Sequence, residues 1–213
     1  MRCIPTKEEM QRALEARHGT TLQAKFANST VAICGLGGLG SNIAVSLARA
    51  GIGRLILIDF DKVDLSNLHR QQYKADQIGC HKTEALRENL QEIAPYTDIV
   101  THTVRITEEN LRGLLQDADI ICEAFDGAEE KAMLVNGVLE QLHTKYLIAA
   151  SGMAGLGSAN SIKTRKVMER FYLCGDGVSD VAEDIGLVAP RVMLCAAHQA
   201  QMVLRILSGK NEP

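Results

Sequence analysis

The feature that most constrains the fold is a short apolar run that ends in glycines. Residues Thr30–Cys34 read TVAIC and are followed at once by the turn Gly35-Leu-Gly37-Gly38-Leu-Gly40. Such a run is typical of a buried strand, and glycines allow a tight turn into a helix. The start of that helix offers free N–H groups and the positive end of its dipole, which favour phosphate. The segment therefore predicts the phosphate-binding turn of a nucleotide site.

Strand-like and helix-like segments alternate from this turn as far as residue 150. Further strands are expected at 54–59, 99–104, 119–123 and 146–150, and helices at 41–50, 82–94, 108–115 and 129–142. This alternation predicts a parallel sheet with helices on both faces. Two more strand-like segments, 161–165 and 169–173, follow each other without a helix between them. We therefore expect an α/β fold that is Rossmann-like, doubly wound and mostly parallel, with an antiparallel C-terminal extension.

The chain length of 213 residues suits one globular domain. We expect a helical arm at 1–28, built around an amphipathic helix at 7–17, and a nucleotide-binding core at 29–150. The sheet extension, a polar loop and a final helix at 190–207 would complete the domain over 151–213.

Charge and composition narrow the possible partners. The formal net charge is -3, aromatic residues make up 4% of the chain and tryptophan is absent, which gives little attraction for nucleic acid. No segment approaches the ~18 continuous apolar residues of a membrane helix, and the charged N-terminus lacks a signal peptide's apolar stretch. We expect a cytoplasmic protein that binds neither membranes nor nucleic acid.

The residues after the second expected strand distinguish between nucleotides. Asp59 could accept the ribose hydroxyls of either NAD or ATP. The polar segment that follows adds carboxylates, amides and a guanidinium: Asp61, Asp64, Asn67, Arg70 and Gln71. A dehydrogenase needs one acid here, whereas a triphosphate needs an arginine that binds phosphate oxygens in a fork and amides that fix them. The segment favours ATP.

Two further residues fit a bound triphosphate. Lys82 begins an expected helix, where the dipole disfavours a cation unless an anion binds nearby. Asp126 follows the fourth expected strand, at the sheet edge where ligands bind, and its carboxylate would approach phosphates only through a cation such as Mg²⁺. The alternatives are a solvated surface lysine and a capping residue for the helix at Glu129.

The segments GLGGLG, LIDFDKVDLSNLHRQ, GCHKTEAL and EAFDG together resemble the ThiF/MoeB family of adenylyltransferases, relatives of ubiquitin-activating enzymes. ASGMAG and GLVAPRV extend the resemblance, and the short C-terminal part, with GDGVSD and AAHQAQMVLRILSG, is most similar to the compact thiamine-biosynthesis branch. The resemblance implies a homodimer that uses ATP and Mg²⁺. It would adenylate the C-terminal glycine carboxylate of a small ubiquitin-like, ThiS-like sulfur-carrier protein ending in Gly-Gly, releasing pyrophosphate.

The same resemblance implies roles for individual residues. Gly35, Gly37, Gly38 and Gly40 would form the nucleotide-binding turn, and Asp59 and Asp61 would bind the ribose. The triphosphate would contact Asn67, Arg70, Gln71 and Lys82. Asp126 would be the Mg²⁺ ligand. An arginine from the partner subunit's arm would complete the site, and Arg17 is favoured over Arg12. The reaction would mainly require stabilisation of the negative charge on the phosphates and not a general base, because the attacking carboxylate is already ionised.

The chain departs from the family pattern in its cysteines. It has six, but no CxxC pair, so we expect no structural zinc. The loop at 181–184, where thiamine-branch enzymes often carry a persulfide-forming cysteine, has none. Cys174 lies at the edge of this loop and fits an ordinary strand residue, which disfavours sulfur transfer by this chain.

Other functions remain open at this stage. A tRNA threonylcarbamoyladenosine dehydratase-like enzyme would share the nucleotide residues, but a more basic surface would be expected. An NAD-dependent oxidoreductase is supported only by the glycine turn and Asp59. A non-catalytic binding module is disfavoured by the presence of Arg70, Lys82 and Asp126 together.

Overall fold

The structure is a computed structural model that describes residues 4–181 and 185–213. A seven-stranded sheet with the order β3-β2-β1-β4-β5-β7-β6 forms its centre. The strands are β1 (Thr30–Cys34), β2 (Arg54–Ile58), β3 (Asp98–His102), β4 (Ile120–Glu123), β5 (Tyr146–Ala150), β6 (Lys163–Met168) and β7 (Phe171–Gly175). Every neighbouring pair is parallel except β6 with β7. The Rossmann-like, mostly parallel fold class is therefore confirmed.

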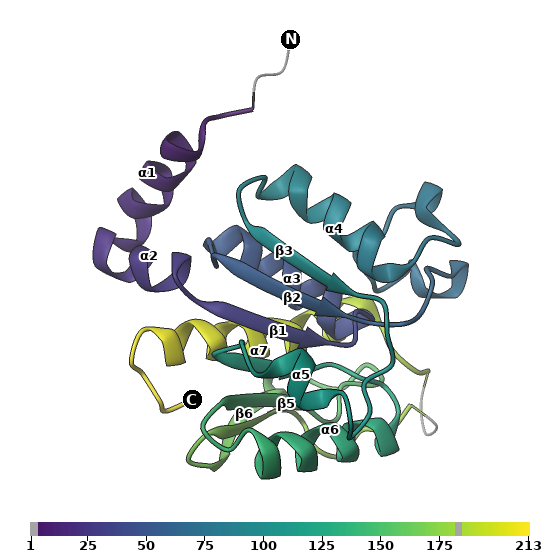
Figure 1. Cartoon of the computed structure of the whole chain (residues 1–213). Coiled ribbons are helices and arrows are strands. Elements are labelled where there is room, and N and C mark those ends of the chain that lie inside the picture. Colours follow the sequence, from purple (N-terminus) through teal and green to yellow (C-terminus); the bar gives the residue numbers. More distant parts are fainter. Residues whose placement is uncertain (1–3, 182–184) are drawn as a thin grey trace.

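Helices cover both faces of this sheet (Figure 1). They are α1 (Lys7–His18), α2 (Thr20–Ala27), α3 (Gly38–Ala50), α4 (Lys82–Ile93), α5 (Leu111–Leu115), α6 (Ala128–Gln141) and α7 (Ala189–Leu207). One hydrophobic cluster joins α3, α4 and α7 to the sheet, and a second joins α5 and α6 to its other face. Alternate residues of β1 enter the two clusters, Val31 the first and Ala32 the second, because successive strand side chains point to opposite faces.

The C-terminal strands differ in detail from the expectation. They lie two to three residues later than expected, and β7 is parallel to β5, so that only β6 is antiparallel. A tight turn at residues 169–170 reverses the chain between β6 and β7, and the later strand is the one that pairs with the body of the sheet. The earlier strand β6 is left at the edge, where its charged and mostly exposed side chains discourage pairing with another sheet.

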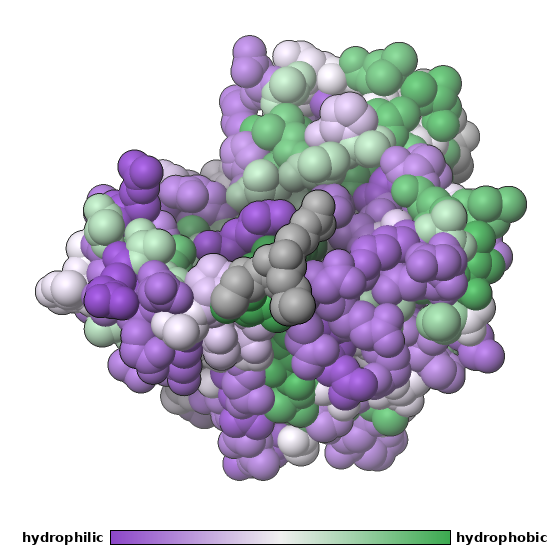
Figure 2. Space-filling model, turned by 90° about the horizontal axis from the view of Figure 1, so that it is seen from above, coloured by the Kyte–Doolittle hydropathy of each residue, from purple (hydrophilic) through white to green (hydrophobic). Residues whose placement is uncertain are grey.

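The N-terminal arm consists of two helices where the sequence predicted one. Gly19, with φ 81°, separates α1 from α2, and Thr6 and Glu9 form a capping box at the start of α1. α1 contains no buried residue and extends from the end of the molecule opposite the carboxyl ends of the parallel strands (Figure 1). Seen from above, hydrophilic side chains alternate with separate hydrophobic patches (Figure 2). No helix in the described part of the chain combines the length and apolar character that crossing a membrane requires.

A buried ion pair fixes the loops that precede α7. The Arg191 guanidinium donates hydrogen bonds to the Asp176 carboxylate, to the Ser161 hydroxyl and to three backbone carbonyls, those of Ala154, Gly157 and Ser158. Asp176 also accepts hydrogen bonds from the backbone N–H groups of Val178 and Ser179. Desolvation would raise the pKa of Asp176, but these hydrogen bonds outweigh it and lower the pKa to about 2. The pair thus holds segments 154–161 and 176–179 against α7.

Replacing Arg191 by Met should lower the free energy of unfolding by about 3–5 kcal/mol, because Asp176 would stay buried without a counter-charge. Because the pKa of Asp176 is lowered in the folded state, its contribution should be complete above the unfolded-state pKa of about 3.9. The contribution should disappear as the pH falls toward about 2. Denaturant unfolding at several pH values, with the exposed Arg112→Met as control, measures both effects. An equal change in the control would contradict this assignment.

Candidate functional site

A cavity of about 670 Å³ lies at the carboxyl ends of the strands. Its lining residues follow β1, β2, β3, β4 and β5, and the segment around the start of α7 closes one side. Open α/β sheets bind ligands at this edge, and the volume suits a small molecule. Ten of the expected site residues line it: Gly35, Gly37, Gly38, Asp59, Asp61, Asn67, Arg70, Gln71, Lys82 and Asp126.

The glycine turn lets α3 begin directly against β1. Gly35 has φ 90°, and a Cβ on Gly40 would overlap the Gly35 carbonyl oxygen. α3 starts at Gly38 without a capping side chain, so the N–H groups of its first turn have no partner in the helix. Gly37 borders the cavity, where an added Cβ would have only Gln71 nearby, at 3.7 Å. The turn therefore forms an open, electropositive binding site for an anion.

A lysine and two carboxylates form the adjoining wall. The Asp59 carboxylate accepts hydrogen bonds from the backbone N–H groups of Leu36 at 2.6 Å and Asp61 at 2.8 Å. The Lys82 ammonium lies 2.8 Å from an Asp61 oxygen and 3.9 Å from an Asp59 oxygen. Burial raises the pKa of Asp59, and the Lys82 charge opposes that rise. Because the side chain of Lys82 is only 7% exposed, the alternative of a solvated surface lysine is wrong.

Two buried polar atoms on the cavity wall have no hydrogen-bond partner among the described residues. They are Nε of Arg70 and Oε1 of Gln71, which belong to the polar segment after β2. The backbone of this segment is fixed, because Arg70 and Gln71 donate to the Asn67 carbonyl and Asn42 of α3 donates to the Arg70 carbonyl. Buried polar groups are rarely left unsatisfied in native proteins. Because Arg70 and Gln71 themselves line the cavity, these two atoms are the unsatisfied groups nearest to a ligand bound there.

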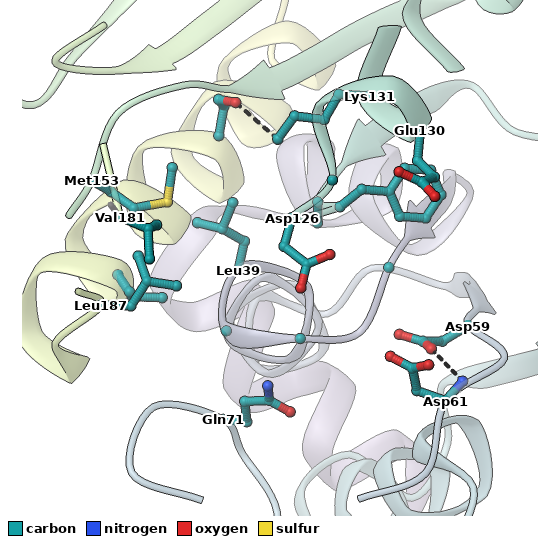
Figure 3. Close-up of a pocket in the computed structure, with 18 of the residues that line it drawn as sticks. Leu39, Asp59, Asp61, Gln71, Asp126, Glu130, Lys131, Met153, Val181 and Leu187 are labelled. Atoms are coloured by element: carbon teal, nitrogen blue, oxygen red, sulfur yellow. Dashed lines mark hydrogen bonds between the residues drawn. The ribbon is translucent and has the colours of Figure 1, made fainter. Parts of the chain in front are cut away.

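Asp126 points into the middle of the cavity (Figure 3). The N-cap of α6 is Gly127, with no side-chain cap bond, so the capping role considered for Asp126 is wrong. An ion pair between the buried Glu123 and the partly exposed Lys131, 2.9 Å apart, fixes the preceding backbone, since Glu123 also accepts a hydrogen bond from the Phe125 N–H. Burial raises the pKa of Glu123, and Lys131 opposes this. The exposed Asp126 carboxylate is therefore held on a rigid base.

A second compartment of the cavity is apolar and was not anticipated from the sequence. Figure 3 shows Leu39, Met153, Val181 and Leu187 together on the side of Asp126 away from Asp59 and Asp61. These side chains come from α3 and from loops on both sides of β6 and β7. No spacing in the sequence brings them together. The cavity thus has a polar half and an apolar half, with Asp126 between them.

The remaining expected residues lie elsewhere. Arg17 is exposed on α1 and is not among the residues that line the cavity. Gly40 does not line it either, but packs against the Gly35 carbonyl within the turn. Cys174 is fully buried, and burial raises its pKa to about 11, so the thiol stays protonated, in agreement with an ordinary strand residue. Residues 182–184, in the loop that lacks the persulfide-forming cysteine, lie outside the described residues. Within the described ranges, no three His, Cys, Asp or Glu side chains are grouped to hold a metal ion.

Comparison with known proteins extends this description. The ThiF family profile matches residues 10–213. The adenylyltransferase and sulfurtransferase MOCS3 of Aedes aegypti is 36% identical over 136 residues, which cover 63% of this chain and 31% of that protein. The adenylyltransferase and sulfurtransferase UBA4 of Scheffersomyces stipitis is 30% identical over 88% of this chain and 43% of that protein. The chain therefore spans less than half of the length of these relatives.

A solved structure shares the fold over nearly all of both chains. It is the E. coli tRNA N6-threonylcarbamoyladenosine dehydratase TcdA in complex with ATP, with a TM-score of 0.85, 19% identity and 98% coverage of each chain. Because the family profile extends over almost the whole sequence, from the arm to the last residue, this protein belongs to the ThiF family.

Proposed function

We propose that this protein uses ATP to adenylate the C-terminal glycine carboxylate of a small ubiquitin-like sulfur carrier. The observation that carries this proposal is the division of the cavity into two halves. Cations and helix N–H groups line one half, apolar side chains line the other, and the Asp126 carboxylate stands between them. The similarity to MOCS3 and UBA4, both named as adenylyltransferases, supports the same activity.

In this proposal the polar half receives the triphosphate. The first turn of α3, Arg70 and Lys82 offer N–H donors and positive charge to the α-phosphate and to the leaving pyrophosphate. The unsatisfied Nε of Arg70 and Oε1 of Gln71 would find partners in the nucleotide and its hydration shell. No general base is required, because a carboxylate attacks in its ionised form.

Mg²⁺ suits Asp126, whose exposed carboxylate has no hydrogen-bond partner among the described residues and supplies the oxygen ligand that this ion prefers. The ion would neutralise charge on the phosphates. The Glu123–Lys131 pair would keep the ligand in place, since it fixes the backbone on which Asp126 is carried.

We assign the ribose to the acid pair after β2. Both Asp59 oxygens already accept backbone N–H groups, whereas the Asp61 side chain is 48% exposed and, among the described residues, is held only by Lys82. Asp61 would therefore make the more accessible contact with the ribose hydroxyls, and Asp59 would set its position.

We further propose a homodimer in which the partner subunit's arm completes the site, as in the thiamine branch that the sequence resembles. The arm lies at the opposite end of the molecule from this chain's own cavity (Figure 1). Arg12 donates to the Glu8 carbonyl within α1, whereas no side-chain hydrogen bond of Arg17 is seen in the described part of the chain. Arg17 is therefore the better candidate.

A second candidate function is that of a tRNA threonylcarbamoyladenosine dehydratase, favoured by the TM-score of 0.85 with full mutual coverage. The apolar half of the cavity and the net charge of -3 favour a protein tail over tRNA. The nucleotide contacts would be the same in either case.

ATP with Mg²⁺ should bind and NAD⁺ should not, because the charged wall matches a triphosphate. Isothermal titration of the same preparation with each ligand checks this. Tight NAD⁺ binding in the absence of ATP binding would contradict adenylation.

Arg70→Ala and Asp126→Asn should each slow acyl-adenylate formation by about a hundredfold, roughly 3 kcal/mol, with little change in melting temperature. Lys82→Ala should slow it as much, but should also alter stability, because Asp59 and Asp61 lose their counter-charge. ATP–pyrophosphate exchange is the measurement, and the exposed Lys74→Ala is the matched control. Unchanged exchange in both Arg70→Ala and Lys82→Ala would defeat this site.

The substrate can be identified by the same exchange reaction. A carrier protein ending in Gly-Gly should stimulate exchange, and a carrier without its last glycine should not. Threonylcarbamoyl-modified tRNA should have no effect. Stimulation by the tRNA instead would establish the second candidate function.

A further inference from the structure

Several aromatic and aliphatic side chains border the cavity beyond the acid pair. Phe60 stands between Asp59 and Asp61, and Val104 and Ile106 follow β3, the neighbour of β2 at the sheet edge. Phe60 is 45% and Val104 40% exposed, which leaves apolar surface open on this side. A nucleotide with its phosphates at α3 and its ribose at β2 would direct its base toward β3.

Arg105 crosses this part of the cavity. Its guanidinium carbon lies 4.5 Å from the centre of the Phe60 ring, and an Nη1 hydrogen bond of 3.2 Å joins it to Glu130 of α6. The Arg105 side chain is 58% exposed, so much of it remains open although the guanidinium lies over the Phe60 ring. Figure 3 shows Glu130 above Asp59 and Asp61, on the side away from Met153 and Leu187.

Fold stability gives no sufficient reason for this arrangement. Exposed ion pairs and cation–π contacts at exposed sites each contribute little to the free energy of unfolding. The contacts with Phe60 and Glu130 instead hold the planar guanidinium of Arg105 at the cavity wall. A fixed guanidinium plane supported by an aromatic ring is a stacking surface for a flat ligand.

We propose that Arg105, supported by Phe60 and fixed by Glu130, stacks on the purine base of the bound nucleotide. This inference rests on the proposed use of ATP and adds a residue that acts on the base and not on the phosphates. The acid pair separates Arg105 from the phosphate seat at α3, since Asp59 and Asp61 follow β2, between β1 and β3 in the sheet.

The test compares two ligands that share phosphates but differ in the base. Dissociation constants for ATP and for inorganic tripolyphosphate, both with Mg²⁺, are measured by calorimetry on the wild type, Arg105→Ala, Arg105→Lys and the control Arg112→Ala. Arg105→Ala should weaken ATP binding roughly tenfold and leave tripolyphosphate binding unchanged. Arg105→Lys should weaken ATP binding similarly, because an ammonium keeps the charge but has no plane.

The outcomes separate this inference from the proposed function. If the wild type and Arg105→Ala bind ATP equally well, stacking by Arg105 is overturned while ATP binding stands. Equal weakening of ATP and tripolyphosphate would assign Arg105 to the phosphates and also overturn the inference. A wild type that binds neither ligand would overturn the proposed function and the inference together.

Discussion

α3 approaches β1 so closely that the glycine turn between them admits no side chain at Gly40. At Gly40 there is no room for even a methyl group against the Gly35 carbonyl, and Gly35 itself needs a positive φ. This contact brings the N-terminus of the helix to the carboxyl edge of the sheet, where its unpaired N–H groups face the cavity. α7 packs beside α3, and Val192 closes against Gly38, so the wall of the apolar half is set by the same contact. A larger side chain in the turn would therefore displace both the phosphate-binding turn and the apolar half of the cavity.

Buried charge organises the same edge of the sheet. Lys82 balances Asp59 and Asp61, Lys131 balances Glu123, and Arg191 balances Asp176. Each pair joins a helix to a strand end or to the loop that follows it, which fixes the helix and the loop relative to the sheet. Asp126 has no such partner among the described residues, and Arg70 keeps a buried donor without one. Ion pairs thus fix the loops at this edge, whereas Asp126 and the Nε of Arg70 are left for the proposed Mg²⁺ and nucleotide.

The two halves of the cavity suit the two substrates of the proposed adenylation. The polar half favours a charged triphosphate, and the apolar half favours a chain that presents its carboxylate beside Asp126. Arg105 extends the polar half toward β3, where a flat base would find both a guanidinium plane and exposed apolar side chains. The arm of this chain lies at the far end from both halves, which is the geometric reason to look for a partner subunit.

Local patterns in the sequence predicted most of the elements and most of the residues that line the polar half of the cavity. The period of the apolar residues predicted the strands β1 to β5 and their helices. Asp59, Arg70 and Asp126 were expected near one edge because they follow strands, and Lys82 because it begins a helix, and these signals are local along the chain. Three features followed only from the packing of the whole chain: β7 pairs with β5, Arg105 lies over Phe60, and Met153 and Leu187 border the same half of the cavity. Those contacts join segments far apart in the sequence, and their choice depends on how helices and loops pack in three dimensions, which no local pattern records.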